Sequence, residues 1–378
     1  MPRIVRRLIG LVAALVGLAL LVAVAAVAVF AFANSPPQAL AYPFPELEGV
    51  AIERYGVAAG LAEGSAGTVV RFDVRRGESS QSVGNRLEAA GLIRHRYFWN
   101  LMARFSDEHV RAGSYLIEVP SSQMAIRSLL ESGREILLRV TVPEGLTVRE
   151  TALIMESAGI TTAREFIAAA SDPEILARYR IPAPSMEGFL FPDTYLFPAG
   201  FPATRIVQAM ADNFFAQIAA IDDRMPAMSP EDLLRTVVLA SIVEKEHSVA
   251  AEAAMMAGVF TNRLNIGMRL QSCATIVYIL AEELGEDHEE TRIHRRYGNR
   301  ILYRHLVIRS PFNTYMVPGL PPAPIASPGA TALSAAFSPA RTEYLFFALR
   351  PGGGGTHNFS RTLAEHNRFA REFHESLR

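Results

Sequence analysis

Two glutamates follow a long apolar segment, and a carboxylic acid beside an apolar surface is suited to proton transfer. Residues 233–243 read LLRTVVLASIV, an uninterrupted helix pattern, and Glu244 and Glu246 come directly after it. Apolar surroundings raise the pKa of a carboxyl group, as a general acid at neutral pH requires. Because the two glutamates point in different directions on a helix, only one can serve such a site. The alternative is that they pair with an arginine or mark where the helix reaches solvent.

An aromatic segment with polar groups could form part of a sugar-binding wall. Residues 185–198 read SMEGFLFPDTYLFP and contain Glu187, Asp193 and Thr194 among the rings. Two prolines exclude a regular helix, so we expect a shaped loop or an extended segment. Aromatic faces pack against the apolar C–H faces of sugars, but aromatic packing in the core is the alternative interpretation.

The elements that must hold these groups begin with an apolar N-terminal segment. Three arginines in residues 1–7 precede residues 8–33, which carry no charge. At about 1.5 Å per residue, this helix exceeds the roughly 30 Å of a bilayer's hydrocarbon layer. The sequence predicts a transmembrane helix over 8–33, a cytoplasmic tail over 1–7, and the remainder on the outer side. A cleavable signal peptide is the alternative, since Ala31-Phe32-Ala33 resembles a cleavage site.

Composition excludes several classes of protein and site. The formal net charge is −1 over 378 residues, so no basic excess indicates nucleic-acid binding. Cys273 is the only cysteine, which excludes an intramolecular disulfide and a metal site built on several thiolates. We expect neither a metal nor another cofactor.

The rest of the chain divides into a linker and two folded parts. Residues 34–67 are rich in Pro, Ala and Gly and are predicted to be a linker. Residues 68–140 follow the order strand, helix, helix, strand, with glycine turns. This order looks like a LysM-like α+β module, the kind that binds glycan chains, although a spacer domain is the alternative. Residues 141–378 contain the two glutamates and mix helix and strand patterns.

Three segments of this last part are predicted to be surface loops. Residues 282–304 are dense in charges of both signs, as in a solvated loop with short helical pieces. Residues 309–331 are rich in Pro and Gly and too long for a plain connection, which indicates a functional loop. Four glycines at 352–355 suit a mobile lip above a cleft or a flexible turn.

Several phrases of the sequence, in this order, resemble the endolytic murein transglycosylase family, the YceG-like or MltG-like proteins. They are VPEGLTV from Val142, MEGFLFPDTYLFP from Met186, LASIVEKE from Leu239, VFTNRL from Val259, GMRLQS from Gly267, SPFNTY from Ser310 with GLPPAPIASPG, and THNFSRTLAEHN from Thr356. The resemblance extends from Phe72 to Phe373. It implies an α+β protein with an N-terminal transmembrane helix, a LysM-like module and a YceG-like catalytic domain.

The resemblance also implies an activity and a catalytic residue. Enzymes of the family cleave the β-1,4 bond between N-acetylmuramic acid and N-acetylglucosamine within glycan strands and leave a 1,6-anhydro end. The second Glu of the VEKE phrase is catalytic, which assigns that role to Glu246, with Glu244 as a supporting residue. One carboxylate suffices because the sugar's own 6-hydroxyl attacks, whereas hydrolytic glycosidases usually need two.

Other side chains are expected to orient the sugar or to support the loops around it. Hydrogen-bonding groups at Gln271, Asn313, Tyr315, His357 and Asn358 are predicted to bind the saccharide. Supporting roles are predicted for Glu187, Asp193, Glu244 and Asn367. His357 could instead orient Glu246 or have no role. Asn313 could simply begin a tight turn.

The chain departs from the family pattern at two points. Ser272-Cys273 stands where the family has Asp-Pro, so a carboxylate and a proline are missing from a segment expected to line the cleft. Arg309 stands where an acidic residue is common. Cys273 favours an alternative function, a non-catalytic peptidoglycan-binding scaffold. A third hypothesis, a Cys or metal hydrolase built on Cys273, His357 and His366, lacks any ligand spacing.

Location and partners are likewise implied by the resemblance. It implies an inner-membrane protein with its catalytic domain in the periplasm and peptidoglycan glycan strands as its substrate. It also implies work beside peptidoglycan synthases that ends nascent strands. No nucleic acid is expected as a partner.

Overall fold

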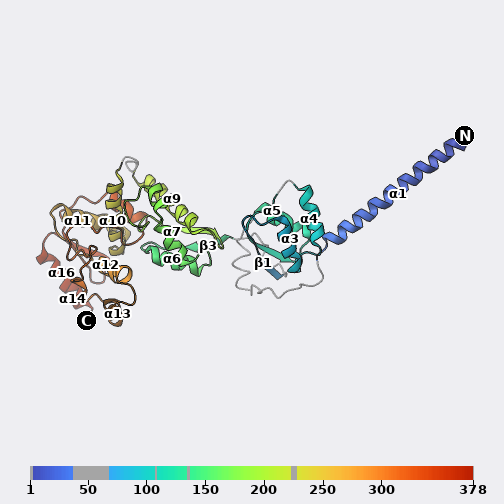
Figure 1. Cartoon of the computed structure of the whole chain (residues 1–378). Helices are drawn as coiled ribbons and strands as arrows, with labels where there is room; N and C mark the ends of the chain where they lie inside the picture. Colours follow the sequence, from blue (N-terminus) through green and yellow to red (C-terminus); the bar gives the residue numbers. More distant parts are fainter. Residues whose placement is uncertain (1–2, 37–67, 107–108, 134–136, 223–227, 378) are drawn as a thin grey trace. The chain divides into compact units, whose positions relative to one another are not determined.

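The computed structural model describes residues 3–36, 68–106, 109–133, 137–222 and 228–377 of the chain (Figure 1). These residues form two compact units, Met1–Leu138 and Arg139–Arg378. Both contain helices and short antiparallel strands, so the α+β class is confirmed. The predicted linker over 34–67 lies almost wholly outside the described residues.

The first unit begins with the long apolar helix α1, Arg3–Asn34. Its segment Ala14–Asn34 is long and apolar enough to cross a membrane, with a mean hydropathy of 2.9. None of that window is buried inside the protein, as it would be in the core helix of a soluble domain. The helix therefore fits the predicted single-pass anchor.

The rest of the first unit is a small module built on one pair of strands. β1, Thr68–Val74, pairs antiparallel with β2, Gly113–Val119, so that Thr68 lies opposite Val119 and Val74 opposite Gly113. The helices are α3 (Ser80–Ala89), α4 (Arg96–Phe105) and α5 (Gln123–Ser132). The predicted order of strand, helix, helix and strand is thus present.

A compact apolar core holds this module together. Trp99 of α4 and Tyr115 of β2 are both fully buried in it, beside Leu87 of α3 and Leu130 of α5. The Trp99 indole N–H donates to the Ser80 carbonyl over 2.8 Å, so its only polar atom is satisfied. Burial of these side chains fixes α3, α4 and α5 on the strand pair.

The second unit contains most of the helices and two further strand pairs. β3, Leu137–Thr141, is hydrogen-bonded to β4, Thr194–Pro198, and β5, Phe346–Leu349, pairs antiparallel with β6, His357–Ser360. The helices before the central region are α6 (Val148–Ser157), α7 (Ala163–Ala170), α8 (Pro173–Tyr179) and α9 (Ala203–Ile221). Those that follow are α10 (Pro230–Glu246), η2 (Ala250–Glu252), α11 (Ala253–Asn265), α12 (Cys273–Tyr278), the π-helical turn η3 (Ile279–Glu283), α13 (Glu289–Arg296), α14 (Tyr303–Leu306), α15 (Ala330–Phe337) and α16 (Leu363–Ser376).

Helix α10 is the central helix of this unit. Ser229 caps its N-terminus by accepting from the Asp232 amide, and Pro230 occupies the first turn. All residues from Val237 to Val243 are buried, and α10 packs on α11, α12 and α15. The apolar segment therefore forms the predicted buried helix, and Glu246 is its last residue.

The charged segment 282–304 differs in part from the expected solvated loop. Its short helical pieces are present as α13 and α14. Ile301 and Leu306, however, pack on a buried cluster of Ile276, Ile279 and Leu280. The charges therefore cover a small apolar core, which a local count of charged residues does not reveal.

Candidate active site

Glu246 is the last residue of α10 and remains partly accessible to solvent. The Ser272 hydroxyl donates to its Oε1 atom over 2.6 Å, and the Ala274 amide also donates to the carboxylate. Both donors belong to the start of α12, where helix N–H groups lack partners within the helix. The carboxylate thus accepts two hydrogen bonds that fix its orientation.

The segment that supplies these donors is held by the loop around Thr314. The Ser272 amide donates to Thr314 Oγ1 over 3.0 Å, and the Gln271 amide donates to the Thr314 carbonyl over 3.1 Å. Gln271 has φ of 52°, a left-handed conformation that costs free energy in any residue but Gly. The bonds on both sides of this turn therefore stabilise the position from which Ser272 reaches Glu246.

The surroundings of Glu246 favour its protonated form while leaving the charged form accessible. Burial raises its pKa above the usual value of a glutamate. The hydrogen bonds from Ser272 and Ala274 and the nearby His357 and Arg263 act in the opposite direction. A carboxyl group under these opposing influences can donate a proton and then accept one back.

Arg263 of α11 provides a fixed positive charge near Glu246. Its guanidinium donates to the Leu345 carbonyl over 2.6 Å and to the Leu270 carbonyl over 2.5 Å, and it lies over the Phe346 ring. Only 7% of the residue is exposed. Two of its N–H groups are engaged with backbone carbonyls, and its charge lowers the pKa of Glu246.

A second carboxylate, Glu252, orients His357. It accepts from the His357 backbone amide over 3.0 Å and lies 2.9 Å from the ring atom Nδ1. The edge of the same imidazole packs against Phe347. The imidazole is thus fixed at Nδ1, and its charge influences Glu246. No local pattern in the sequence marks Glu252, because its partner His357 is 105 residues away.

Of the predicted substrate-binding residues, Gln271, Tyr315 and His357 lie near Glu246, whereas the structure gives Asn358 and Asn313 other partners. Gln271 and Tyr315 are close to Glu246, the first through its neighbour Ser272 and the second through its charge interaction with Glu246. His357 is close to it through its charge as well. Asn358, on β6, accepts from Arg350 Nε over 3.1 Å, beside His357 in the chain.

Asn313 is fully buried, and its amide group is occupied by the backbone. Its Nδ2 atom donates to the carbonyls of Leu306 and Ile308, and its Oδ1 atom accepts from the Tyr315 amide. The side chain therefore shapes the turn that presents Tyr315, the alternative role considered from the sequence. Direct contact of Asn313 with a sugar stays a prediction, and this burial argues against it.

The predicted supporting residues lie in separate places. Glu244 accepts from the Gly329 amide over 3.0 Å and so ties α10 to the segment before α15. Asp193 accepts from Asn213 over 3.0 Å and from the Thr194 amide. Asn367 is exposed on α16. Glu244 and Glu246 thus use different partners, as the helix geometry predicted.

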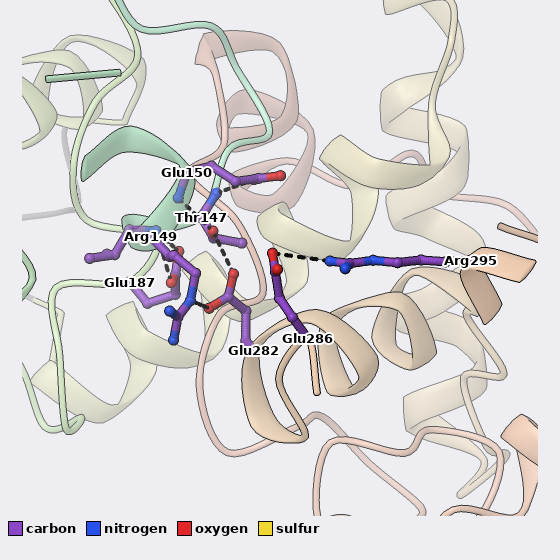
Figure 2. A network of polar contacts seen from close by, with 8 residues as sticks. Thr147, Arg149, Glu150, Glu187, Glu282, Glu286 and Arg295 are labelled. Atoms are coloured by element: carbon purple, nitrogen blue, oxygen red, sulfur yellow. Dashed lines mark hydrogen bonds and ion pairs between the residues drawn. The ribbon is translucent and has the colours of Figure 1, made fainter. Parts of the chain in front are cut away.

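Glu187 belongs to a network at the N-terminus of α6 (Figure 2). Its carboxylate accepts from the Val148 amide over 3.1 Å and is 6% exposed. Beside it, Glu282 accepts from the Thr147 hydroxyl over 2.9 Å and from Arg149 over 2.8 Å. Burial raises the pKa of Glu187 to about 8 against the pull of the Val148 amide, and Glu282 and Glu150 add to the rise.

Gly188 explains why the chain can turn at Glu187. It has φ of +83°, and a Cβ atom there would lie 2.4 Å from the Pro324 Cβ. Only glycine satisfies both the left-handed backbone and this close approach. The Glu-Gly pair of the MEGFLF phrase therefore has a structural reason independent of any sugar.

The three residues of the hydrolase hypothesis are engaged with different partners. Cys273 Sγ lies 3.0 Å from Tyr315 Oη, His357 is bound to Glu252, and His366 stacks on Phe346. Among the described residues, no group of three His, Cys, Asp or Glu side chains could hold a metal ion. The side chains around Glu246 provide one acid with hydrogen-bond donors and cationic neighbours.

The structure is an α+β protein whose first unit contains an apolar helix and a small folded module, and whose second unit contains Glu246 at the end of α10. The profile of the YceG-like family matches residues 72–372, which is most of the chain. The chain belongs to the YceG-like family, and the resemblance seen in the sequence is confirmed.

Individual relatives agree with this assignment. The endolytic murein transglycosylase of Bacillus subtilis (strain 168) is 26% identical over 320 residues, covering 80% of this chain and 84% of the relative. That of Streptococcus pneumoniae serotype 2 is 27% identical over 342 residues, and the match spans 58% of its length. The crystal structure of a putative YceG-like protein from Listeria monocytogenes aligns with a TM-score of 0.51 and 26% identity, covering 80% of this chain and 99% of that one.

Proposed function

We propose that the protein is a membrane-anchored endolytic lytic transglycosylase of peptidoglycan, with Glu246 as its acid and base. The observation that carries the proposal is the carboxyl group of Glu246, whose pKa is raised by burial and whose Oε1 atom accepts a hydrogen bond from the Ser272 hydroxyl. The names of the B. subtilis and S. pneumoniae relatives support murein as the substrate.

The proposed reaction needs one proton donor that later acts as a base. Protonated Glu246 donates to the glycosidic oxygen between N-acetylmuramic acid and N-acetylglucosamine, and the bond from that oxygen to C1 breaks. The 6-hydroxyl oxygen of the muramic acid then bonds to C1, and its proton passes to the Glu246 carboxylate. The bond broken is replaced by a 1,6-anhydro bond, Glu246 regains its proton, and no water is consumed.

The neighbours of Glu246 have separate tasks in this scheme. The Ser272 hydroxyl and the Ala274 amide stabilise the carboxylate formed after the first proton transfer. Arg263 supplies positive charge at the same moment. His357, with Nδ1 fixed by Glu252, has its second ring nitrogen free of that bond and can contact the saccharide.

The proposal extends to the anchor and the module. The three arginines in the first turns of α1 support a cytoplasmic N-terminus, with the folded units in the periplasm of an inner-membrane protein. The module of β1, α3, α4 and β2 is proposed to be LysM-like and to bind glycan, a role supported by its order of elements. Proximity to peptidoglycan synthases follows from a substrate that is made at the membrane.

The products of glycan digestion in water labelled with ¹⁸O test the reaction. The purified full chain in detergent is incubated with uncrosslinked glycan strands, and the fragments are examined by mass spectrometry. We expect internal cuts and muramic acid ends that are one water lighter and free of ¹⁸O. Labelled reducing ends would show hydrolysis and overturn the mechanism. Binding of strands without cleavage would support the non-catalytic scaffold that the Cys273 substitution suggested.

A further inference from the structure

Helix α4 exposes a row of large apolar side chains. Tyr97 is 72% exposed, Leu101 50% and Phe105 83%. They are four residues apart, so they lie on one face of the helix, opposite to Trp99, which is fully buried in the module's core. We call Tyr97, Leu101 and Phe105 the α4 stripe. Nothing in the packing of the module requires these side chains to be apolar.

The exposed apolar surface of the module is concentrated at this place. In the described part of residues 68–138, the large hydrophobic side chains that are exposed are those of the α4 stripe and Met124 of α5. Single exposed apolar residues are common in soluble domains, but a cluster marks an interaction surface. The remaining question is which partner covers this surface.

The apolar helix α1 ends next to α4 (Figure 1). The Phe30 ring packs edge-on against Phe98 of α4 at 5.4 Å, and the Met124 amide donates to Asn34 Oδ1 over 2.9 Å. Phe30 also lines an open groove of about 500 Å³ together with Leu101 and Phe105 of the stripe and Met124, and the ion pair of Arg127 and Glu131 lines the same groove. The stripe is therefore continuous with the apolar surface of α1.

This contact fixes the depth of the stripe relative to a membrane. Phe30 lies four residues before the end of the candidate span Ala14–Asn34, about 6 Å along the helix axis. Side chains that share a groove with Phe30 must lie at the boundary between headgroups and acyl chains when this span crosses a bilayer. Arg96 and Arg104 are exposed on the same helix. Aromatic and basic side chains are the residues favoured at that boundary.

We propose that the α4 stripe lies in the interface of the membrane that α1 crosses, with lipid acyl chains in the groove beside Phe30. The partner is the phospholipid bilayer itself. This inference rests on the anchoring role proposed for α1 and is independent of the catalytic role of Glu246. It gives the module a second attachment to the membrane, in addition to the covalent one.

Fluorescence quenching in vesicles tests the proposal on the full chain. Cys273→Ser removes the only cysteine, and single cysteines are introduced as Leu101→Cys or Phe105→Cys and labelled with an environment-sensitive nitrobenzoxadiazole dye. Leu21→Cys in α1 and Gln81→Cys, an exposed polar position on α3, are the matched controls. The vesicles contain phosphatidylethanolamine and phosphatidylglycerol, with or without lipids that carry a spin-label quencher on the acyl chain. Trp99, the only tryptophan, reports through its emission that the module is folded in every variant.

Each outcome separates the stripe from the anchor. We expect the spin-labelled lipids to reduce dye fluorescence at positions 21, 101 and 105, and to leave it unchanged at position 81. Quenching at position 21 alone would overturn the proposal while keeping the anchor. Equal quenching at 81 and 105 would also overturn it, since a specific face would not be involved. No quenching at position 21 would remove both the anchor and the inference.

Discussion

Glu246 and Glu187 are two carboxyl groups whose charged neighbours have opposite signs. Burial raises the pKa of both. Glu187 is almost completely enclosed and has Glu282 and Glu150 as neighbours, which raise its pKa further, to about 8. Glu246 is partly open and has Arg263 and His357 as neighbours, which lower its pKa.

The comparison shows that a raised pKa alone does not identify a catalytic acid. Burial and negatively charged neighbours raise the pKa of Glu187 to about 8, so the group stays protonated at neutral pH. Glu246 has hydrogen-bond donors and cationic neighbours that make its charged form accessible during a reaction. Solvent access and the sign of the neighbouring charges decide between a structural and a reactive carboxyl group.

The largest expected effect is the loss of glycan turnover when Glu246 can no longer transfer a proton. Glu246→Gln keeps the shape of the side chain but cannot transfer a proton, so turnover of glycan strands should fall by about 10² to 10⁴. Glu244→Gln, two residues earlier on the same helix, is the matched control and should retain most activity. Release of anhydro-ended fragments measures turnover, and circular dichroism verifies the fold. Equal losses in both variants would mean that the wrong glutamate was assigned.

The buried carboxyl group of Glu187 should make the free energy of unfolding depend on pH. The pKa of Glu187 is raised from 4.5 to about 8, so the folded state binds one more proton than the unfolded state between these values. Stability should therefore be full below pH 4.5 and fall, by on the order of a few kcal/mol, as pH rises to 8.

Glu187→Gln should remove this decrease. Urea unfolding at pH 5 and pH 8.5 is expected to show similar stability of both proteins at the lower pH and higher stability of the variant at the upper pH. Activity per folded molecule should stay unchanged. A wild type whose stability does not decrease across this interval would contradict the enclosed state of Glu187.

A smaller effect is expected from the carboxylate that orients His357. Glu252→Gln weakens a hydrogen bond to a charged group, worth about 1.5 to 3 kcal/mol, so kcat should fall roughly tenfold or more. The pH profile of kcat/KM should change as well, because the charge next to His357 is lost. Glu343→Gln, at an exposed carboxylate paired with Arg361, is the control. Unchanged kcat and an unchanged profile would show that Glu252 only supports the fold.

The smallest effect concerns the hydrogen bond from Ser272. This bond stabilises the Glu246 carboxylate and is worth roughly 1 kcal/mol, so Ser272→Ala should raise the Glu246 pKa further. Because the protonated form is needed, activity should decline with rising pH, and this decline should move to higher pH in the variant. The pH dependence of kcat/KM measures it. A shift to lower pH would contradict the direction of the hydrogen bond.

Local sequence determined a large part of this protein. The uncharged segment before Asn34, the apolar residues of α10 and the glycine turns of the first module each specify their element through patterns within about 20 residues. The helical period by itself separates Glu244 from Glu246, because residues two apart on a helix point in different directions. The family phrases singled out Glu246, whose catalytic role stays a proposal.

Only the tertiary structure decided what surrounds that carboxylate. Ser272 reaches Glu246 across 26 residues and Glu252 reaches His357 across 105, and Asn313 is taken up by backbone carbonyls instead of facing a ligand. Tertiary structure also decided that negative charges surround Glu187 and that the α4 stripe lies beside Phe30. Periodicity fixes which face a side chain takes on its own helix, but the partner on that face depends on long-range packing, which no local pattern encodes.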